Sequence, residues 1–477
     1  MPMDTLHNRS GASGNNRPNI VFFFTDDQRF DTIRALGNEQ IFTPTMDSWV
    51  RQGTTFTYAH IMGGTSGAVC MPSRAMLMTG RTLFHLEREG QNIPEEHVML
   101  AEVLQEAGYR TFGTGKWHNG TGSYARSFTD GAEIFFGGMD DHWNVPACNY
   151  DPTGKYDLAC PVVRNPHYSN RVAYRRCDHI TPGKHSSELF SEAAIDFIED
   201  YDSDAPVFMY ISFMAPHDPR TMPREYLDMY DPERIPLPEN FMPEHPFDNG
   251  ELVVRDEKLA PWPRTPEEIR RHIAEYYAMI THADAQIGRV LARLEETGRA
   301  ENTIIVFAGD NGLALGQHGL MGKQNLYDHS LRVPLIMCGP GIPKGRKSDA
   351  FCYLSDIYPT LCDLIGVPVP DSVEGKSLVP AMRNSGKTRD TMFFAYKGLH
   401  RCVRDERYKL IEYVVNGKQT TQLFDIRADP WELNNLADDA TCTEHLKRLR
   451  AELLRWRDEL DDQASSFGKK FWQTYCL

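Results

Sequence analysis

The run NIVFFFT, residues 19–25, predicts a buried β-strand close to the N-terminus of the chain. It is continuously apolar, rich in β-branched and aromatic residues, and ends at the acidic pair Asp26-Asp27. Such a run, without polar alternation, is typical of a strand covered on both faces of a parallel sheet. Two similar runs, PVFMYISFM (206–214) and TIIVFA (303–308), occur later, with helical periodicity between them. This alternation predicts an α/β fold with a large, mixed, mostly parallel sheet flanked by helices.

The C-terminal part of the sequence has a different pattern. Short apolar segments from residue 388 onward, with an Asn-Gly turn signal, predict hairpin-linked antiparallel strands followed by an amphipathic helix. We therefore predict an α/β domain over residues 18–385 and a smaller subdomain, an antiparallel sheet plus a helix, over residues 386–477. Residues 1–17 are polar and are expected to form a disordered leader.

Two long segments lack clear periodicity. Residues 119–184 are rich in Gly, Pro, Asn and aromatic residues, and residues 219–266 are rich in proline and acidic residues. We expect loops in both. Loops of this length usually serve a function or are disordered, and the first segment is a candidate wall of a pocket.

The composition excludes several functional classes. The 477-residue chain carries a formal net charge of −15, which argues against non-specific binding to nucleic acid or an anionic membrane. No stretch approaches the ~20 apolar residues that span a bilayer. Without an apolar signal-peptide core we expect a cytoplasmic protein; a periplasmic or secreted one is the alternative if a signal was removed. The ten cysteines form no CxxC pair, so free thiols are expected, with pairing among Cys148, Cys160 and Cys177 left open.

A second informative stretch is VCMPSRAMLMTGR, residues 69–81. Pro72 suits the first turn of a helix, and Gly80 falls where a C-terminal cap is expected. Cys70 would then lie at a helix N-terminus, where unpaired N–H groups favour anions, and Arg74 adds a bidentate donor one turn further. Taken alone, such a cysteine is more often a small buried hydrophobe.

Polar side chains follow the predicted strands. Asp26 and Asp27 come directly after the first strand, and Asp310 and Asn311 come after the third. Because ligands gather outside the carboxyl ends of strands in open α/β sheets, these four side chains are expected to lie close together. Their hard oxygen atoms suit Ca²⁺ or Mg²⁺. For one pair alone, turn or capping residues are the favoured explanation.

Basic side chains are expected at the same edge. Lys116 and His118 follow another strand, and His217 follows the strand over residues 206–214. Two histidines at strand ends beside carboxylates are candidates for acid–base groups. Lys323 lies on a glycine-rich loop that can approach a ligand closely.

The pattern of these residues resembles a known family. Cys70-Met71-Pro72-Ser73-Arg74, followed by Leu77, Thr79 and Gly80, is similar to the first signature of the type I sulfatases, which belong to the alkaline phosphatase superfamily. GYRTFGTGKWH (108–118) resembles their second signature, and LFDIRADPWELNNLA (423–437) resembles a C-terminal motif of the family. The resemblance extends over residues 18–438 and implies an alkaline-phosphatase-like fold and sulfuric ester hydrolysis.

The resemblance also implies a cofactor and roles for the site residues. In sulfatases the cysteine at the position of Cys70 is oxidised to 3-oxoalanine (formylglycine) by a formylglycine-generating enzyme, and its hydrate attacks sulfur. The family pattern places a calcium ion on Asp26, Asp27, residue 70, Asp310 and Asn311. Arg74 would orient residue 70 and bind the carboxylates of the metal site. The remaining catalytic candidates, which would hold sulfate or move protons, are Lys116, His118, His217 and Lys323.

The substrate implied by the resemblance is a sulfated sugar. The segment from His217 onward is similar to iduronate-type sulfatases, which suggests a uronate 2-O-sulfate, although these enzymes typically have histidine where this chain has Asn311. The candidate substrate-binding residues are His85, Arg88, His142, Trp143, Arg220 and His318, with Arg81 beside them. Each is equally explained by ordinary packing.

Two alternatives and one open question accompany this prediction. A phosphodiester or phosphonate monoester hydrolase of the same superfamily needs similar groups, since phosphorus also offers a tetrahedral oxyanion. A non-catalytic relative that binds sulfated glycans is the second alternative. The oligomeric state is left open.

Overall fold

The computed structural model describes residues 17–86, 90–163, 167–383 and 386–476. Apart from Arg17, the predicted leader lies outside the described residues, and so does the predicted boundary at residue 385. The domain limits therefore stay predictions.

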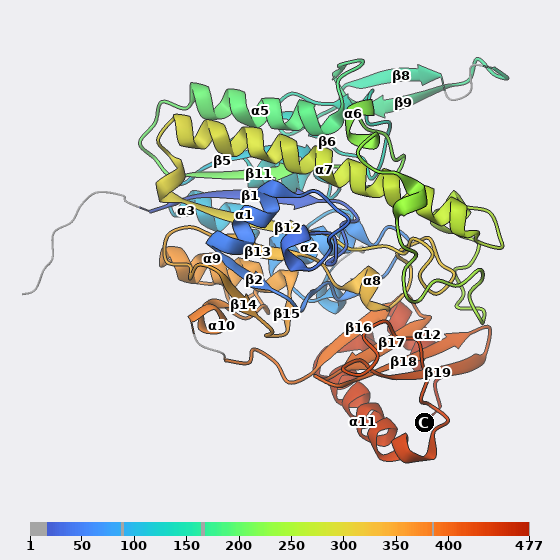
Figure 1. Cartoon of the computed structure of the whole chain (residues 1–477). Helices are drawn as coiled ribbons and strands as arrows, with labels where there is room; N and C mark the ends of the chain where they lie inside the picture. The colour runs from blue at the N-terminus through green and yellow to red at the C-terminus, as the bar shows by residue number, and fades with distance from the viewer. Residues whose placement is uncertain (1–16, 87–89, 164–166, 384–385, 477) are drawn as a thin grey trace, which may run out of the picture.

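Within the described residues, the main sheet has eight strands, and β1 lies near its centre (Figure 1). Their order is β14 (Arg346–Ser348), β2 (Thr54–Phe56), β13 (Leu335–Cys338), β12 (Thr303–Gly309), β1 (Asn19–Thr25), β11 (Val207–Ser212), β5 (Arg110–Lys116) and β6 (Asp130–Phe135). β13 runs antiparallel to both neighbours, and all other pairs are parallel. The predicted mixed, mostly parallel sheet is confirmed.

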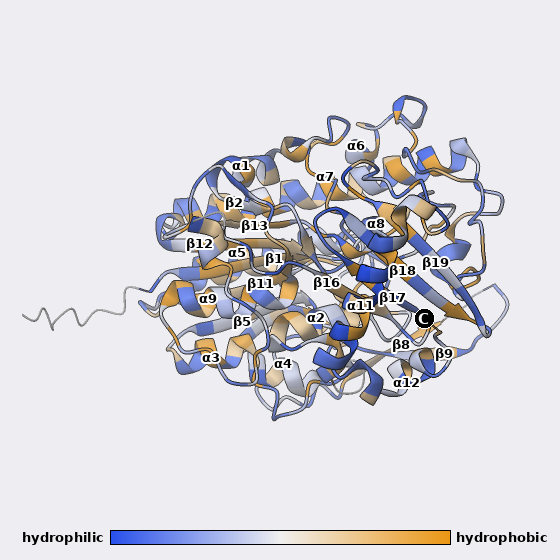
Figure 2. Cartoon of the chain, turned by 90° about the horizontal axis from the view of Figure 1, so that it is seen from below, coloured by the Kyte–Doolittle hydropathy of each residue, from blue (hydrophilic) through white to orange (hydrophobic). Residues whose placement is uncertain are grey.

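Helices cover both faces of this sheet, as Figure 1 shows. One face packs against α1 (Pro44–Gln52), α5 (Ser186–Asp200) and α7 (Pro266–Glu296). The other packs against α2 (Cys70–Thr79), α3 (Leu100–Glu106), α4 (Thr121–Ser127) and α9 (Ile357–Ile365). Figure 2 colours the central strands towards orange because their residues are hydrophobic, and all seven residues of β1 are buried. Burial on two faces explains why the strand sequences lack polar alternation.

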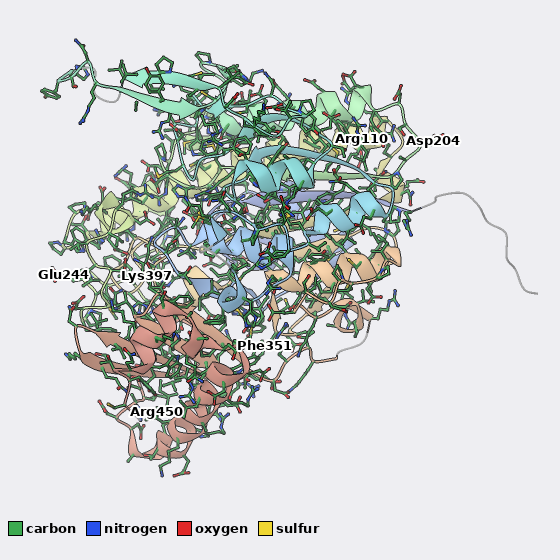
Figure 3. The ribbon with its side chains drawn as sticks, turned by 180° about the vertical axis from the view of Figure 1, so that it is seen from behind. Arg110, Asp204, Glu244, Phe351, Lys397 and Arg450 are labelled. Carbon is green, nitrogen blue, oxygen red and sulfur yellow. The ribbon has the colours of Figure 1, made fainter. Side chains whose placement is uncertain are left out.

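The C-terminal subdomain contains the predicted antiparallel sheet and helix. Its strands are β16 (Met392–Tyr396), β17 (His400–Arg404), β18 (Tyr408–Val415) and β19 (Lys418–Asp425), and α11 (Thr443–Glu459) packs on them. The N-terminal part of the chain adds β4 (Gly63–Gly64) to this sheet, parallel to β16. Lys397 forms an ion pair with Glu251 at 2.7 Å, and Figure 3 labels Lys397 where the subdomain meets the rest of the molecule. Its sheet and its contacts thus join the subdomain to the larger part of the chain.

The expectation of loops over residues 119–184 was wrong in part. This segment contains α4, the edge strand β6 and an exposed hairpin of β8 (Ala159–Val163) and β9 (Val172–Arg176). Both hairpin strands leave most of their side chains exposed, so neither has an apolar face that the sequence pattern can reveal. The remaining helices and strands are short: β3 (Ala59–His60), β7 (Pro146–Ala147), β10 (His179–Ile180), β15 (Cys352–Tyr353), α6 (Arg224–Leu227), α8 (Asp328–Leu331), α10 (Val379–Arg383) and α12 (Ser466–Trp472).

Two further expectations concern the described part of the chain as a whole. None of its helices combines the length and the apolar character that a bilayer crossing requires. All ten cysteines lie in this part, and each is a free thiol.

Candidate active site

The site lies where the parallel strands of the main sheet end. The carboxyl ends of β1, β5, β11 and β12 share one edge of the sheet, because these strands are neighbours and parallel. The residues that follow them are the predicted acidic and basic side chains. Convergence at this edge is the arrangement expected for ligand sites in open α/β sheets.

Cys70 is the first residue of α2, as the sequence predicts, and Gly80 caps the helix in the left-handed conformation, with φ of 65°. The Sγ atom of Cys70 lies 3.4 Å from His118 Nδ1 and 3.5 Å from Lys116 Nζ. Burial raises the pKa of the Cys70 thiol despite the nearby lysine charges. Since the thiolate is the reactive form of cysteine, this environment does not activate residue 70 as a thiol.

Arg74 is completely buried and ties several strand ends together. Its Nε donates to Asp310 Oδ2 at 2.9 Å, and its Nη1 donates to Ser212 Oγ at 2.6 Å and to the Lys116 carbonyl at 3.0 Å. One helix residue therefore fixes the last residues of β5 and β11 and the residue that follows β12. Arg74 thus links the carboxylate of Asp310 to the ends of two neighbouring strands.

The two acidic pairs are brought together. The Asp27 backbone N–H donates to Asp310 Oδ1 at 3.0 Å, and Asn311 Nδ2 donates to Asp27 Oδ1 at 2.5 Å. All four side chains are almost completely buried: Asp26, Asp27, Asp310 and Asn311. Asp27 has a left-handed backbone, with φ of 65°, which is costly for a residue with a side chain and points to a functional constraint.

Charge crowding is strong in this cluster. Burial, together with the negative charge of Asp26, raises the pKa of Asp310 to about 7. Burial would also raise the pKa of Asp26, but the ammonium group of Lys116, which is ion-paired with it, holds that pKa below its ordinary value. The carboxylates thus depend on nearby positive charge to stay ionised.

The predicted basic residues surround the same carboxylates. Lys323 Nζ lies 2.5 Å from Asp27 Oδ1, and His217 Nε2 lies 3.6 Å from Asp27 Oδ2. Burial alone would lower the pKa of Lys323, but the negative charge of Asp27 raises it well above its ordinary value. His118 has a left-handed backbone, with φ of 69°, and burial lowers the pKa of its imidazole well below the usual range. It is therefore neutral at pH 7.

A cavity of about 250 Å³ opens onto this cluster. Cys70, His118, His217 and Lys323 line it, together with residues that the sequence analysis missed: Gly138, Met139, Arg255, Asp256 and Gln324. Arg255 pairs with Asp218 and, at 2.5 Å, with Asp256. Gln324 Nε2 donates to Asp256 Oδ2 at 2.7 Å.

Three of the proposed substrate-binding residues make contacts away from the cavity. His142 is fully buried; its Nε2 lies 3.0 Å from the His217 carbonyl and its Nδ1 2.7 Å from Ser186 Oγ. Arg220 Nη1 lies 2.7 Å from His272 Nδ1. Trp143 packs edge-on against His185. None of the three is among the described residues that line the cavity.

The other proposed substrate-binding residues lie elsewhere. His85 Nδ1 lies 2.5 Å from Glu374 Oε1, and Arg81 Nε donates to the His85 carbonyl at 3.0 Å. His318 is buried and stacks on Tyr327 with ring centroids 3.9 Å apart. Arg88 lies outside the described residues. The structure does not bring His85 or His318 to the cavity, and a role in substrate binding stays a prediction for this set.

Comparison with known proteins identifies the family. The family model described as Sulfatase matches residues 18–367, well over half of the chain. The chain belongs to the sulfatase family. A second model, N-sulphoglucosamine sulphohydrolase, C-terminal, matches residues 316–459.

Relatives of this sulfatase match along almost its whole length. It is 30% identical to an arylsulfatase from Clostridium perfringens, over 96% of this chain and 98% of that protein. It is 27% identical to an N-acetylglucosamine-6-O-sulfatase from Bacteroides thetaiotaomicron, over 94% of this chain and 87% of that protein. A solved structure in complex with its substrate, D-glucosamine-2-N,6-O-disulfate, superposes with a TM-score of 0.72 at 25% identity, covering 95% of this chain and 100% of that one.

The residues of this sulfatase fit a divalent cation, which the family generally uses together with a formylglycine. Oxygen or sulfur atoms of Asp26, Cys70 and Asp310 all lie within 4.8 Å of one another and are buried. Asp26 Oδ1 and Asn311 Oδ1 are also buried and have no hydrogen-bond partner among the described residues. Unpaired buried oxygens are costly, and hard oxygen donors of this kind suit Ca²⁺ or Mg²⁺.

Gly138 provides a test of the position of His118 in this sulfatase. A Cβ atom at residue 138 would lie 2.8 Å from His118 Cε1 and Nε2. We expect Gly138→Ala to displace the imidazole and lower kcat/KM for a sulfate ester by about 10- to 100-fold, as for a misplaced acid–base group. Gly122→Ala is the matched control, because a Cβ there meets no atom within 4 Å. Equal activity of the two variants would contradict the placement.

Proposed function

We propose that this sulfatase removes sulfate from a sulfated carbohydrate, with residue 70 converted from cysteine to formylglycine and with bound Ca²⁺, or else Mg²⁺. The relatives support a sugar substrate, since one is named for N-acetylglucosamine 6-O-sulfate and one structure holds a glucosamine disulfate. A uronate 2-O-sulfate stays a prediction to be compared with these hexosamine sulfates.

The observation that carries the proposal is the position of residue 70. It is the first residue of α2, it lines the cavity, and both Lys116 and His118 approach its side-chain tip. When converted, residue 70 supplies the oxygen nucleophile that its poorly activated thiol cannot provide. Asp26, Asp27, residue 70, Asp310 and Asn311 would hold a divalent cation, which would supply positive charge that neutralises sulfate oxygens.

The other side chains bind the anion and move protons. Lys323 and His217 line the cavity, so they can donate to sulfate oxygens and to the leaving oxygen. His118 is neutral because burial lowers its pKa, so its Nδ1, 3.4 Å from the tip of residue 70, can accept a proton there. Arg74 holds Asp310 and the ends of β5 and β11 in register with residue 70.

Maturation by a formylglycine-generating enzyme sets a constraint on timing. Every residue of α2, from Cys70 to Thr79, is buried in the folded chain. An enzyme cannot reach this segment in the native state. We therefore propose that conversion precedes completion of the fold.

The proposal is tested on the tryptic peptide of residues 52–74, which ends at Arg74. In protein made with the maturation enzyme we expect the lower mass of an aldehyde in place of the thiol, stoichiometric calcium, and hydrolysis of 4-nitrophenyl sulfate. An unmodified thiol in fully active protein would overturn the mechanism. A higher kcat/KM for a phenyl phosphonate ester than for the aryl sulfate would instead support the phosphonate hydrolase alternative.

A further inference from the structure

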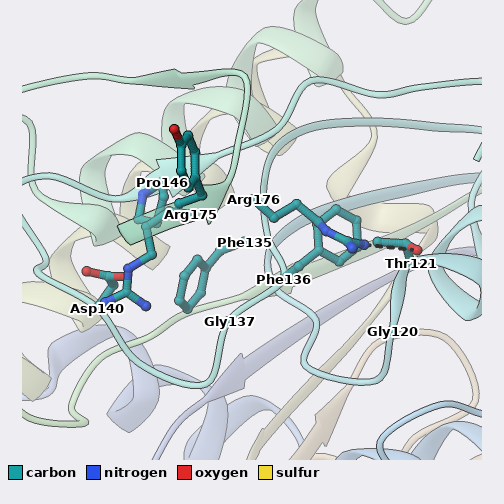
Figure 4. A pocket seen from close by; sticks show the side chains of 10 residues that line it. Gly120, Thr121, Phe135, Phe136, Gly137, Asp140, Pro146, Arg175 and Arg176 are labelled. Carbon is teal, nitrogen blue, oxygen red and sulfur yellow. Dashed lines mark hydrogen bonds and ion pairs between the residues drawn. The ribbon is translucent and has the colours of Figure 1, made fainter. Parts of the chain in front are cut away.

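A second cavity lies next to the candidate active site, at the outer edge of the main sheet. Its volume is about 270 Å³, near the lower end of the range for small-molecule sites. The end of β6, the start of α4 and strand β9 of the exposed hairpin contribute its lining. In Figure 4 the ring of Phe135 lies near Arg175 and Asp140, and the side chain of Arg176 crosses the ring of Phe136 and reaches Thr121. The proposed catalytic steps use none of these side chains.

Two consecutive glycines separate this cavity from the active site. A Cβ atom at Gly137 would lie 2.5 Å from the ring of Phe135, in the lining of the second cavity. A Cβ atom at Gly138 would lie 2.8 Å from the ring of His118, in the lining of the active site. Because neighbouring Cα atoms are only about 3.8 Å apart, one thickness of backbone divides the two cavities. The linings of the two cavities are therefore only one residue apart at Gly137 and Gly138.

The second cavity is positively charged on its outer side. Its lining holds two arginines, Arg175 and Arg176, against one carboxylate, Asp140, in a chain whose net charge is −15. Arg175 is partly neutralised by Asp140, with Nε 3.5 Å from Oδ2. Arg176 is exposed and donates to Thr121 Oγ1 at 3.3 Å, and in the described part of the chain it forms no ion pair. Its guanidinium can thus bind a sulfate or carboxylate in the planar, bidentate manner typical of arginine.

Aromatic side chains complete the lining. Phe135 is buried, Phe136 is half-buried, and Tyr174 is 73% exposed on β9. Flat apolar faces beside a cationic donor suit a sugar ring that carries an anionic group, since the ring presents C–H groups to the aromatic face while the anion pairs with the arginine.

We infer that this cavity, centred on Arg176 and Phe136, is a subsite for a second anionic sugar unit of the substrate. The substrate class is then a sulfated oligosaccharide whose neighbouring residue also carries sulfate or carboxylate. This inference rests on the proposed function, which it narrows from a sulfated carbohydrate to a polyanionic one of at least two units. The negative charge of such a substrate is complementary to the arginines of this cavity, whereas the chain as a whole has a net charge of −15.

The test measures binding separately from turnover. Cys70→Ala protein is titrated calorimetrically with size-defined heparin oligosaccharides, from disaccharide to hexasaccharide, alone and with Arg176→Gln added. We expect Arg176→Gln to weaken tetrasaccharide binding about tenfold, and less at high salt, because a charge-assisted contact to an exposed arginine is lost. Arg171→Gln is the matched control; Arg171 is exposed on the same hairpin and does not line the cavity. It is expected to bind the tetrasaccharide with unchanged affinity.

A kinetic comparison in active enzyme completes the test. The ratio of kcat/KM for the tetrasaccharide to kcat/KM for 4-nitrophenyl sulfate should fall about tenfold in Arg176→Gln and stay constant in Arg171→Gln. The subsite would be overturned if the two variants had equal effects, if the ratio did not change, or if no oligosaccharide bound. In each of these cases, continued hydrolysis of the aryl sulfate would leave the proposed function intact. Exposed Tyr168 and Val172 lie on the same hairpin. A loss of dimer in Arg176→Gln with unchanged affinity would identify the hairpin as a contact between copies and would also overturn the subsite.

Discussion

Cys70→Ala is expected to abolish hydrolysis of 4-nitrophenyl sulfate, by at least about 10⁴-fold in kcat, as when a covalent nucleophile is removed. The fold should survive, because the Cys70 side chain is small and its hydrogen-bonding contacts are with Lys116 and His118. Arg74, which ties the strand ends together, is unchanged. Circular dichroism and the thermal unfolding midpoint report on the fold, and initial rates report on turnover.

Two comparisons make this result specific. Cys338→Ala removes another buried cysteine, on β13 of the main sheet, and the variant should keep its activity because Cys338 does not line the cavity. Cys70→Ala made with and without the maturation enzyme should be equally inactive, whereas unsubstituted protein should gain activity only with that enzyme. Residual turnover of Cys70→Ala near the unsubstituted rate would mean that residue 70 is not the nucleophile.

The strands that carry the site were predictable from the sequence because they are buried on both faces. NIVFFFT became β1 with the predicted bounds, Asn19–Thr25, and TIIVFA became most of β12. Continuous apolar runs leave few other structures of that length. The edge strand β6 was missed because Asp130, Gly131 and Glu133 interrupt its apolar residues, and an edge strand is only half buried.

The site was predictable to the extent that its residues follow strands. Asp26, Asp27, Asp310 and Asn311 converge because β1 and β12 are parallel neighbours, which is a property of the topology. Arg255 and Asp256 lie instead in the long irregular segment over residues 219–266. Only tertiary packing brings such a segment to the cavity, and no periodicity in the sequence reports it.

The histidines show a different limit of sequence analysis. His118 and His142 both follow segments at the same sheet edge, yet His118 lines the cavity and His142 supports the carbonyl of His217 from behind. A histidine can bind a ligand or satisfy a buried backbone group, and the sequence does not distinguish the two. The direction of the side chain decides, and the backbone around the residue sets it.

The carboxylate cluster leads to the second large expected effect. Asp26→Asn preserves the shape of the side chain and removes one negative charge. We expect calcium affinity to fall about 100-fold or more, by analogy with loss of a supporting group at other metal sites, and activity to fall with it. Asp26 has one buried oxygen without a partner and another paired with Lys116, so the amide replaces a ligand atom and also releases that lysine.

Calcium content and rate should therefore recover together in Asp26→Asn when calcium is added in excess, because the other donors, Asp27, Asp310 and Asn311, are still present. Asp31→Asn is the matched control: Asp31 lies on the same segment and pairs with Arg29, outside the cluster. It should bind calcium and turn over as the unsubstituted protein does. If Asp26→Asn instead keeps full calcium at limiting concentration and full activity, Asp26 is not a ligand, and the lysine-paired carboxylate serves only to position Lys116.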